Sequence, residues 1–269
     1  MDKIENLKNK RLFLFDIDGV LKLGDEIIDG SKELLKHIEN IGGMSVLITN
    51  NSTKSNTAYV EYFKKFEFEN LKTQNFLTAL DVTKIYLEKN CKNDKIFVVG
   101  TKSMFNELKL AGFDVTDKIE SDISVLLVGY DNELTYQKVA DACNILQTKN
   151  VKYLATNVDL ICPMPFGFVP DCGAIVEFIK FATQKTPKFI GKPEPDMVFE
   201  ALKISGFSKE QALVIGDRLY TDIACGINAG VDTCVVFSGE AKKEDLQTTQ
   251  FVQTYQFDSV KQLLEQLQS

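Results

Sequence analysis

Residues 12–20 read Leu-Phe-Leu-Phe-Asp-Ile-Asp-Gly-Val, and this stretch decides the fold class. Its four leading apolar residues predict a strand that is buried on both faces, as strands are in parallel sheets. Asp16 and Asp18 follow that strand, at the end where open α/β sheets bind their ligands. Gly19 allows the backbone to turn and to approach a bound group closely. The stretch therefore predicts an α/β protein with a ligand site at this strand end.

Composition limits the class of protein and its partners. The chain has 269 residues, of which 44% are hydrophobic, and a formal net charge of −7. This length allows one large domain or two smaller ones. The acidic balance and scattered basic residues argue against a nucleic-acid partner, but a metal ion could still attract an anionic substrate. No apolar stretch approaches the ~18 residues of a membrane span, and the N-terminus is polar, so we expect a cytoplasmic protein without a membrane partner.

Cysteine and histidine are not expected to carry the chemistry. The six cysteines include no Cys-x-x-Cys pair, so a zinc site is not expected from their spacing. The single histidine, His37, lies in a helical pattern and is expected to be structural. Strand and helix patterns alternate along the chain, which predicts a doubly wound parallel sheet covered by helices on both faces. The middle of the chain shows a smaller α/β alternation of its own.

Polar side chains follow four of the predicted strands. In a doubly wound sheet these strand ends share one edge, so the side chains should converge. Three crowded carboxylates would repel one another, and a divalent cation with oxygen ligands, Mg²⁺, would remove that repulsion. A hydroxyl, an amide and a lysine beside such an ion describe a phosphate pocket, in which a carboxylate is the available nucleophile. The residues are Asp16 and Asp18, Thr49 and Asn50, Lys192, and Asp217 and Asp222.

These motifs resemble those of the haloacid dehalogenase superfamily of phosphatases, and more narrowly its NagD-like, or 4-nitrophenylphosphatase-like, branch. Each motif alone is common in turns and helix caps, so the joint arrangement carries the resemblance. It extends through the middle of the chain and therefore covers nearly all of it. The matching stretches are residues 16–20, 48–52, 191–193 and 216–223 in the outer parts and 128–131, 155–157 and 173–176 in the middle.

The resemblance implies how each residue would act. Asp16 would attack phosphorus to give an aspartyl-phosphate, and Asp18 would serve as general acid and then as general base. Mg²⁺ would be bound by the side chains of Asp16 and Asp217 and by the backbone carbonyl of Asp18. Asp222 would hold a metal-bound water or Lys192. The groups expected to bind the phosphate are those of Gly19, Thr49, Asn50, Asn51 and Lys192, of which Thr49 and Lys192 also count as catalytic.

The resemblance also implies two domains. Residues 1–78 and 182–269 would form the catalytic core, and residues 79–181 an inserted cap that closes over the site and sets specificity. Asn157, Asp159 and the loop 163–173 are candidates for facing the substrate, with packing of the cap loop as the alternative. Lys22 stands where relatives often carry an aromatic residue, and Asp171 where they commonly have glycine. Facing the pocket, Lys22 would favour a second anionic group on the substrate, and Asp171 would disfavour one.

The sequence therefore predicts a Mg²⁺-dependent phosphatase that acts on a small phosphorylated metabolite. Nucleoside monophosphates, phosphoglycolate, pyridoxal phosphate and sugar phosphates are all compatible, as is a homodimer through the cap. Two alternatives share the same core chemistry. A phosphotransferase or mutase would need an acceptor alcohol in place of water. A phospho-accepting receiver-like signalling module would need neither Asp18 nor the inserted domain.

Overall fold

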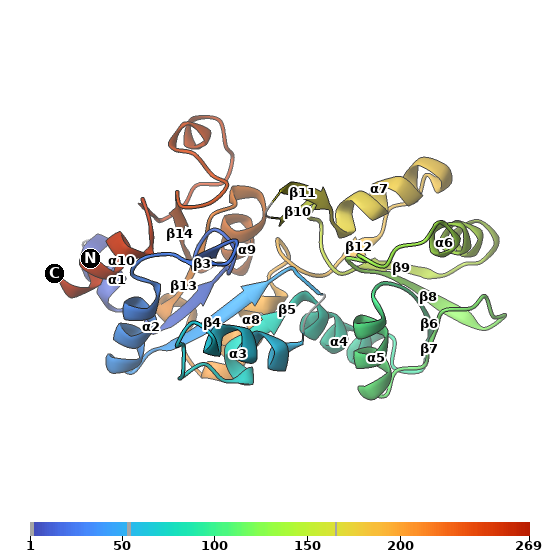
Figure 1. Cartoon of the computed structure of the whole chain (residues 1–269), viewed down its shortest axis with the longest axis horizontal. Coiled ribbons are helices and arrows are strands. Elements are labelled where there is room, and N and C mark those ends of the chain that lie inside the picture. The colour runs from blue at the N-terminus through green and yellow to red at the C-terminus, as the bar shows by residue number, and fades with distance from the viewer. Residues whose placement is uncertain (1–2, 53–54, 165) are drawn as a thin grey trace. The chain divides into compact units, whose positions relative to one another are not determined.

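The computed structural model describes residues 3–52, 55–164 and 166–269 (Figure 1). The chain divides into two compact units, each with its own sheet. Unit 1 consists of Met1–Thr49, Asn56–Leu77 and Lys192–Ser269, and unit 2 of Asn50–Ser55 and Thr78–Gly191. The expected domain bounds differ from these units, which place residues 50–55, 78 and 182–191 with the smaller sheet. Among the described residues, every helix is too short or too polar to traverse a lipid bilayer.

Unit 1 is built on a six-stranded sheet with the order β15-β14-β13-β1-β4-β5. β1 pairs in parallel with β13 on one side and with β4 on the other. All four residues of β1 are fully buried, as the apolar stretch predicts. The strands are β1 (Leu12–Phe15), β4 (Met44–Thr49), β5 (Phe76–Thr78), β13 (Ala212–Gly216), β14 (Asp232–Val236) and β15 (Tyr255–Phe257). The carboxyl ends of β13, β1 and β4 are therefore neighbours at one edge of the sheet.

Helices flank this sheet. Phe13 and Phe15 of β1 belong to a core that also contains apolar side chains of α2, α3 and α10. α8 contacts β1 and β4, and α9 contacts β13 and β14. The helices are α1 (Lys3–Lys8), α2 (Ser31–Asn40), α3 (Asn56–Lys64), α8 (Asp196–Ser205), α9 (Ala224–Ala229) and α10 (Val260–Gln268). A short antiparallel hairpin, β2 (Lys22–Leu23) and β3 (Glu26–Ile27), follows the first strand.

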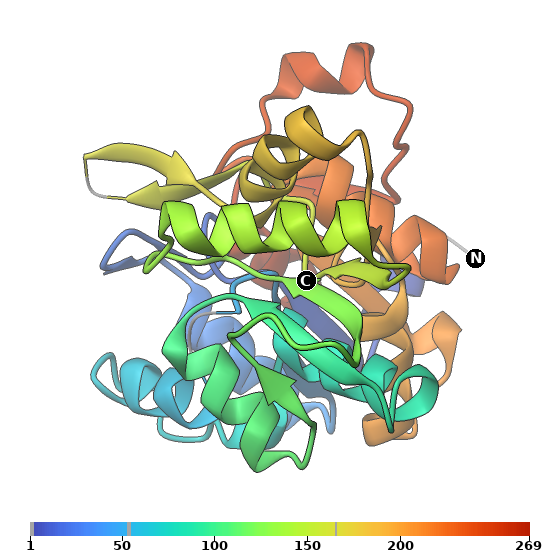
Figure 2. The same cartoon turned by 90° about the vertical axis from the view of Figure 1, so that its right-hand side faces the viewer.

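Unit 2 has a five-stranded parallel sheet with the order β12-β9-β8-β6-β7. Its strands are β6 (Lys95–Val99), β7 (Val115–Thr116), β8 (Ile123–Val128), β9 (Lys152–Ala155) and β12 (Lys188–Phe189). Its helices are α4 (Ala79–Asn90), α5 (Lys102–Leu110), α6 (Tyr136–Thr148) and α7 (Cys172–Thr183). α6 and α7 share one hydrophobic core with β6, β8 and β9 (Figure 2). The doubly wound α/β fold with a second, smaller α/β domain is confirmed.

One premise about the sheet edge is wrong. The strand before Lys192, β12, pairs with β9 in the sheet of unit 2 and not with the strands of unit 1. This pairing is the reason that residues 182–191 belong to unit 2. Lys192 itself opens the last segment of unit 1 and reaches the site of that unit through its side chain. The two-residue strand carries too little pattern to show which sheet it joins.

Candidate active site

The site begins where two neighbouring strands of unit 1 end. Phe15, the last residue of β1, lies opposite Ile215 of β13 in the parallel ladder. The backbone N–H of Asp16 continues this ladder by donating to the carbonyl of Ile215 at 2.9 Å. Asp16 and Asp217 each follow the end of their strand directly. Parallel pairing therefore brings together two carboxylates that are 201 residues apart in the sequence.

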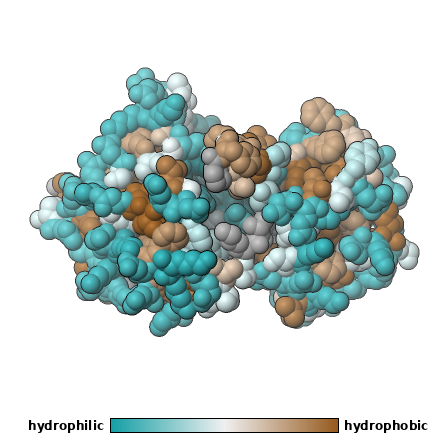
Figure 3. Space-filling model, in the orientation of Figure 1, coloured by the Kyte–Doolittle hydropathy of each residue, from teal (hydrophilic) through white to brown (hydrophobic). Residues whose placement is uncertain are grey.

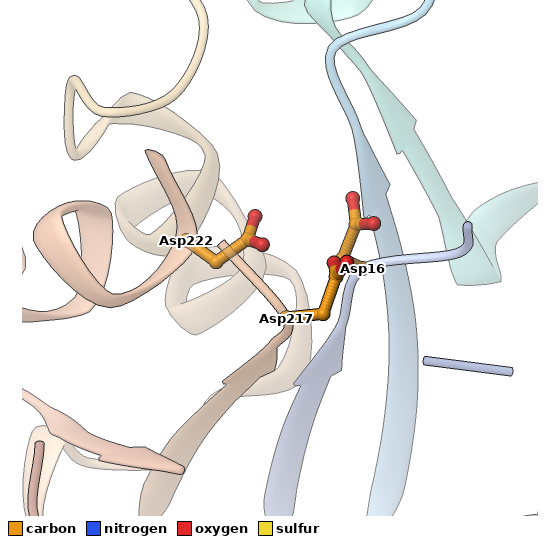
Figure 4. A group of neighbouring side chains, drawn as sticks. All are labelled: Asp16, Asp217 and Asp222. Carbon is orange, nitrogen blue, oxygen red and sulfur yellow. The ribbon is translucent and has the colours of Figure 1, made fainter. Parts of the chain in front are cut away.

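A third carboxylate joins them from the short π-helix Leu219–Ile223. Carboxylate oxygens of Asp16, Asp217 and Asp222 lie within 4.8 Å of one another (Figure 4). Burial, opposed by Lys192 and reinforced by Asp222, raises the pKa of Asp16 to about 7. Burial and the neighbouring Asp16 and Asp222 raise the pKa of Asp217 well above its usual range. A side chain at Gly216 would overlap that of Asp222, so glycine is required for this close approach.

A buried lysine offsets part of this negative charge. Lys192 Nζ lies 2.5 Å from Asp16 Oδ1 and 2.7 Å from Asp222 Oδ1, and it also donates to the carbonyl of Ile48 at 3.3 Å. Its side chain is only 3% exposed. Burial disfavours the charged ammonium, but the two carboxylates outweigh burial and raise the pKa of Lys192. The lysine therefore stays protonated and holds the carboxylates of Asp16 and Asp222 in place.

The donor set fits a hard divalent cation. Asp217 Oδ2 accepts from the backbone N–H of Glu240 at 2.7 Å. Asp217 Oδ1 is buried, and no described residue donates a hydrogen bond to it. Buried polar atoms are rarely left unpaired, and a carboxylate oxygen beside further carboxylates suits Mg²⁺. Both oxygens of Asp222 are engaged, by Lys192 and by the backbone N–H of Arg218 at 3.1 Å. Asp16 and Asp217 are therefore the side chains fitted to hold the ion, and Asp222 orients Lys192.

Asp18 and Gly19 lie in the turn that follows β1. Gly19 has a φ of 85°, in the left-handed region that favours glycine. Its N–H donates to the carbonyl of Lys22 at 2.7 Å, so the amide expected to bind phosphate is engaged within the turn. The carboxylate of Asp18 is 39% exposed and pairs with the ammonium of Lys22. The structure thus gives Gly19 a conformational role, and its phosphate contact stays a prediction. Thr49, at the end of β4, is buried.

The remaining expected residues lie in unit 2, where four of them form a buried polar cluster. Asp159 accepts from the amides of Asn50 at 2.7 Å and Asn157 at 2.9 Å. Asn157 also donates to Asp171 at 3.1 Å, and Asp171 caps the N-terminus of α7 by accepting from the backbone N–H of Cys172 at 2.5 Å. Asn157, Asp159 and Asp171 are at most 5% exposed. Within unit 2 these hydrogen bonds agree with the alternative in which Asn157, Asp159 and Asp171 pack the loop and do not face a substrate.

The part of the loop 163–173 that the structure describes is a hairpin rather than an irregular loop. β10 (Ile161–Met164) pairs with β11 (Gly167–Pro170) in antiparallel register. Met164, Phe166 and Phe168 are 42%, 77% and 64% exposed, so the hairpin carries apolar side chains that are open to solvent. Figure 3 shows that apolar residues gather in patches on the face that it draws. Asn51, expected among the phosphate ligands, is half-buried.

Sequence reasoning missed the segment after β14. Ser238 donates to the carbonyl of Gly19 at 2.6 Å, and the N–H of Glu240 supports Asp217. A side chain at Gly239 would overlap the carboxylate of Asp217. The sequence does show that a short polar stretch, residues 238–240, follows an apolar strand. This stretch lies at the same edge of the sheet as Asp16 and Asp217. Such turns are too frequent to be recognised without knowing the strand order.

Comparisons with known proteins agree with this geometry. A family model described as haloacid dehalogenase-like hydrolase matches residues 13–114, and a second, HAD-hydrolase-like model matches residues 189–263. The acid sugar phosphatase of Staphylococcus aureus strain MRSA252 is 30% identical over 263 residues, which cover 97% of this chain and all of that protein.

Solved structures give the same result along nearly the whole chain. The 4-nitrophenylphosphatase of Thermotoga maritima superposes with a TM-score of 0.88 at 30% identity, covering 97% of this chain and 98% of that one. NagD from Escherichia coli K-12 superposes with a TM-score of 0.84 at 28% identity, covering 94% and 97%. The chain therefore belongs to the haloacid dehalogenase-like hydrolases, in their NagD-like branch.

Proposed function

We propose that this protein is a Mg²⁺-dependent phosphatase that hydrolyses small phosphomonoesters through an aspartyl-phosphate on Asp16. One observation carries the proposal: Asp217 has a buried carboxylate oxygen that lacks a donor among the described residues, and its carboxylate clusters with that of Asp16, which also pairs with the ammonium of Lys192. Family membership supports a hydrolase, and the full-length relatives are named as phosphatases.

Asp16 is the proposed nucleophile. Its side chain is 14% exposed, so a phosphoryl group can reach it, while Lys192 fixes one of its oxygens. Bound Mg²⁺, held by Asp16, Asp217 and the backbone carbonyl of Asp18, would neutralise charge on the phosphoryl oxygens. Lys192 adds a second positive charge beside the nucleophile. Phosphoryl transfer depends mainly on positioning and charge stabilisation, and these residues supply both.

Asp18 is the proposed general acid and base. Its carboxylate is 39% exposed, which supports a role in protonating the leaving group and then activating water. Such assistance contributes roughly 10²–10⁴-fold to a rate. Thr49, Asn50 and Asn51 are proposed to bind phosphate oxygens. Unit 2 is proposed to act as the cap of this branch and to select the small phosphorylated metabolite, without a nucleic-acid or membrane partner.

The test compares the wild type with Asp16→Asn and with Asp29→Asn. Asp29 is an exposed aspartate paired with Lys261, so its variant controls for the loss of one acidic side chain. We expect hydrolysis of 4-nitrophenyl phosphate by the wild type and by Asp29→Asn. EDTA should abolish this activity until Mg²⁺ is restored, and Asp16→Asn should be inactive. Metal-independent hydrolysis, or an active Asp16→Asn, would contradict the proposal.

A phosphotransferase or mutase on the same core is distinguished by the product. With excess sugar or alcohol present, a phosphatase releases inorganic phosphate, whereas a phosphotransferase transfers the group to the acceptor. A receiver-like module would instead accumulate a phosphorylated protein that lasts for many minutes.

A further inference from the structure

We propose that Lys22 is a positioning residue that aligns the carboxylate of Asp18 with the leaving-group oxygen. The inference rests on the proposed phosphatase function and goes beyond it, because it assigns a role to a residue outside the four motifs. Lys22 lies on β2, in a short hairpin that the sequence pattern does not reveal.

The backbone fixes Lys22 beside Asp18. The two residues form an isolated β-bridge, and the N–H of Gly19 donates to the carbonyl of Lys22 at 2.7 Å. The N–H of Lys22 donates in turn to the carbonyl of Ile17 at 3.2 Å. These bonds close the turn that begins at the end of β1. The main chain therefore holds the backbones of Lys22 and Asp18 side by side, within reach of an ion pair between their side chains.

Three groups hold the ammonium of Lys22. It pairs with Asp18 Oδ1, donates to the carbonyl of Gly24 at 3.2 Å and lies 5.7 Å from the ring centroid of Tyr62. The ring of Tyr62 itself packs against the ring of Phe66, with ring centroids 5.2 Å apart. The lysine side chain is only 13% exposed. Exposed ion pairs constrain little because both partners move freely, whereas this lysine is fixed and can orient a partly exposed carboxylate.

For the first phosphoryl transfer, the orientation of Asp18 matters when the leaving group needs a proton. In the first step a bond forms between an Asp16 oxygen and phosphorus while the ester P–O bond breaks. The proton of Asp18 passes to the departing oxygen, and Lys22, which keeps its own protons, pairs with the carboxylate that Asp18 becomes. An alkoxide leaves poorly without that proton, whereas 4-nitrophenolate is stable enough to leave alone. Small misplacements of a catalytic group can cost about 10²-fold in rate. Loss of Lys22 should therefore slow alkyl phosphates selectively.

The experiment measures kcat/KM, which reports the first phosphoryl transfer, for Lys22→Met and Lys22→Arg. The substrates are 4-nitrophenyl phosphate, an uncharged alkyl phosphate and an alkyl phosphate that carries a carboxylate. For Lys22→Met we expect a loss of about 10–100-fold on both alkyl phosphates and less than about threefold on 4-nitrophenyl phosphate. Lys22→Arg keeps the charge and should recover most of the loss. Lys32→Met, which removes an exposed lysine paired with Glu67, should match the wild type on every substrate.

Each other outcome overturns the inference. Equal losses on all three substrates would show a merely structural role, and unchanged rates would show no role. A loss confined to the carboxylate-bearing substrate would make Lys22 a binding residue for the substrate's charge.

Mg²⁺ affinity measured by calorimetry should stay within about twofold of the wild type in Lys22→Met, since Lys22 pairs with the side chain of Asp18 and not with Asp16 or Asp217. A wild type inactive on all substrates with Mg²⁺ would instead refute the proposed function, and the inference with it.

Discussion

Replacing Asp217 with asparagine should stabilise the metal-free protein and remove its response to Mg²⁺. Without an ion, the carboxylate of Asp217 is buried between Asp16 and Asp222, and one of its oxygens lacks a donor among the described residues. Asparagine has the same shape, and its oxygen can keep the hydrogen bond from the N–H of Glu240. Its amide group can donate toward the two remaining carboxylates. The substitution therefore removes a repulsion and adds a donor.

The magnitude follows from the spacing of the carboxylates. Two unit charges 4.8 Å apart repel by about 3.5 kcal/mol at an effective dielectric constant of about 20. Lys192 offsets part of this repulsion, and protonation of Asp217, whose pKa is raised, limits it further. We expect a net gain of about 1–3 kcal/mol in the free energy of unfolding, at about 2–4 °C of Tm per kcal/mol. Mg²⁺ at 100 times its Kd should add about 2.7 kcal/mol to the wild type and almost nothing to the variant.

The assay is thermal unfolding at pH 8 in EDTA and in Mg²⁺. Asp29→Asn, an exposed aspartate of the same unit, should change the free energy of unfolding by at most about 0.5 kcal/mol and keep the full Mg²⁺ shift. A lower Tm of Asp217→Asn in EDTA would refute the repulsion argument. A Mg²⁺ shift equal to that of the wild type would show that Asp217 does not bind the ion.

Three further predictions concern unit 1. The side chain of Lys10 is 1% exposed, and its Nζ lies 2.5 Å from Asp232 Oδ2. Lys10→Met should therefore lower the free energy of unfolding, measured by urea denaturation, by about 3 kcal/mol. A loss below about 1 kcal/mol would contradict a stabilising role for this ion pair. Gly239→Ala should weaken Mg²⁺ binding in calorimetry, because its side chain would displace the carboxylate of Asp217, and an unchanged Kd would refute this packing. In EDTA the free energy of unfolding should rise as pH falls from about 8 to about 5, by up to about 1.4 kcal/mol per pH unit from Asp16, because the folded state raises its pKa to about 7 and binds its proton more tightly than the unfolded chain. The pKa of Asp217 is also raised and adds to this slope, so Asp16→Asn should reduce the slope without removing it, and an unchanged slope would contradict this reasoning.

The sequence predicts the part of the site that depends on strand pattern. The apolar residues before Asp16 and before Asp217 make both strands recognisable, and the rule that ligands bind at the carboxyl ends of parallel strands brings the two carboxylates to one edge. Lys192 was expected at the same edge, but the strand before it joins the sheet of unit 2, so its convergence does not follow from strand pattern. The pairing of Asp222 with Lys192 is what the family resemblance implied.

Other features depend on contacts that leave no local pattern. The bond between Asn50 and Asp159 joins residues 109 positions apart, and neither residue lies in a periodic element. The hairpin that carries Lys22 has two-residue strands, which are too short to show alternation. For the same reason the sequence could not show that the strand before Lys192 joins the sheet of unit 2. In these places tertiary pairing, and not propensity, decides the structure.

The central claim is that Asp16 becomes covalently phosphorylated during turnover. Its most direct test is rapid acid quenching of the enzyme during hydrolysis of 4-nitrophenyl phosphate with Mg²⁺, followed by proteolysis and mass spectrometry. The account predicts a phosphoryl group on the peptide that contains Asp16, present with Mg²⁺ and absent with EDTA. A phosphoryl group on any other residue, or steady turnover in H₂¹⁸O that transfers ¹⁸O to phosphate without a phosphorylated protein at any quench time, would contradict it.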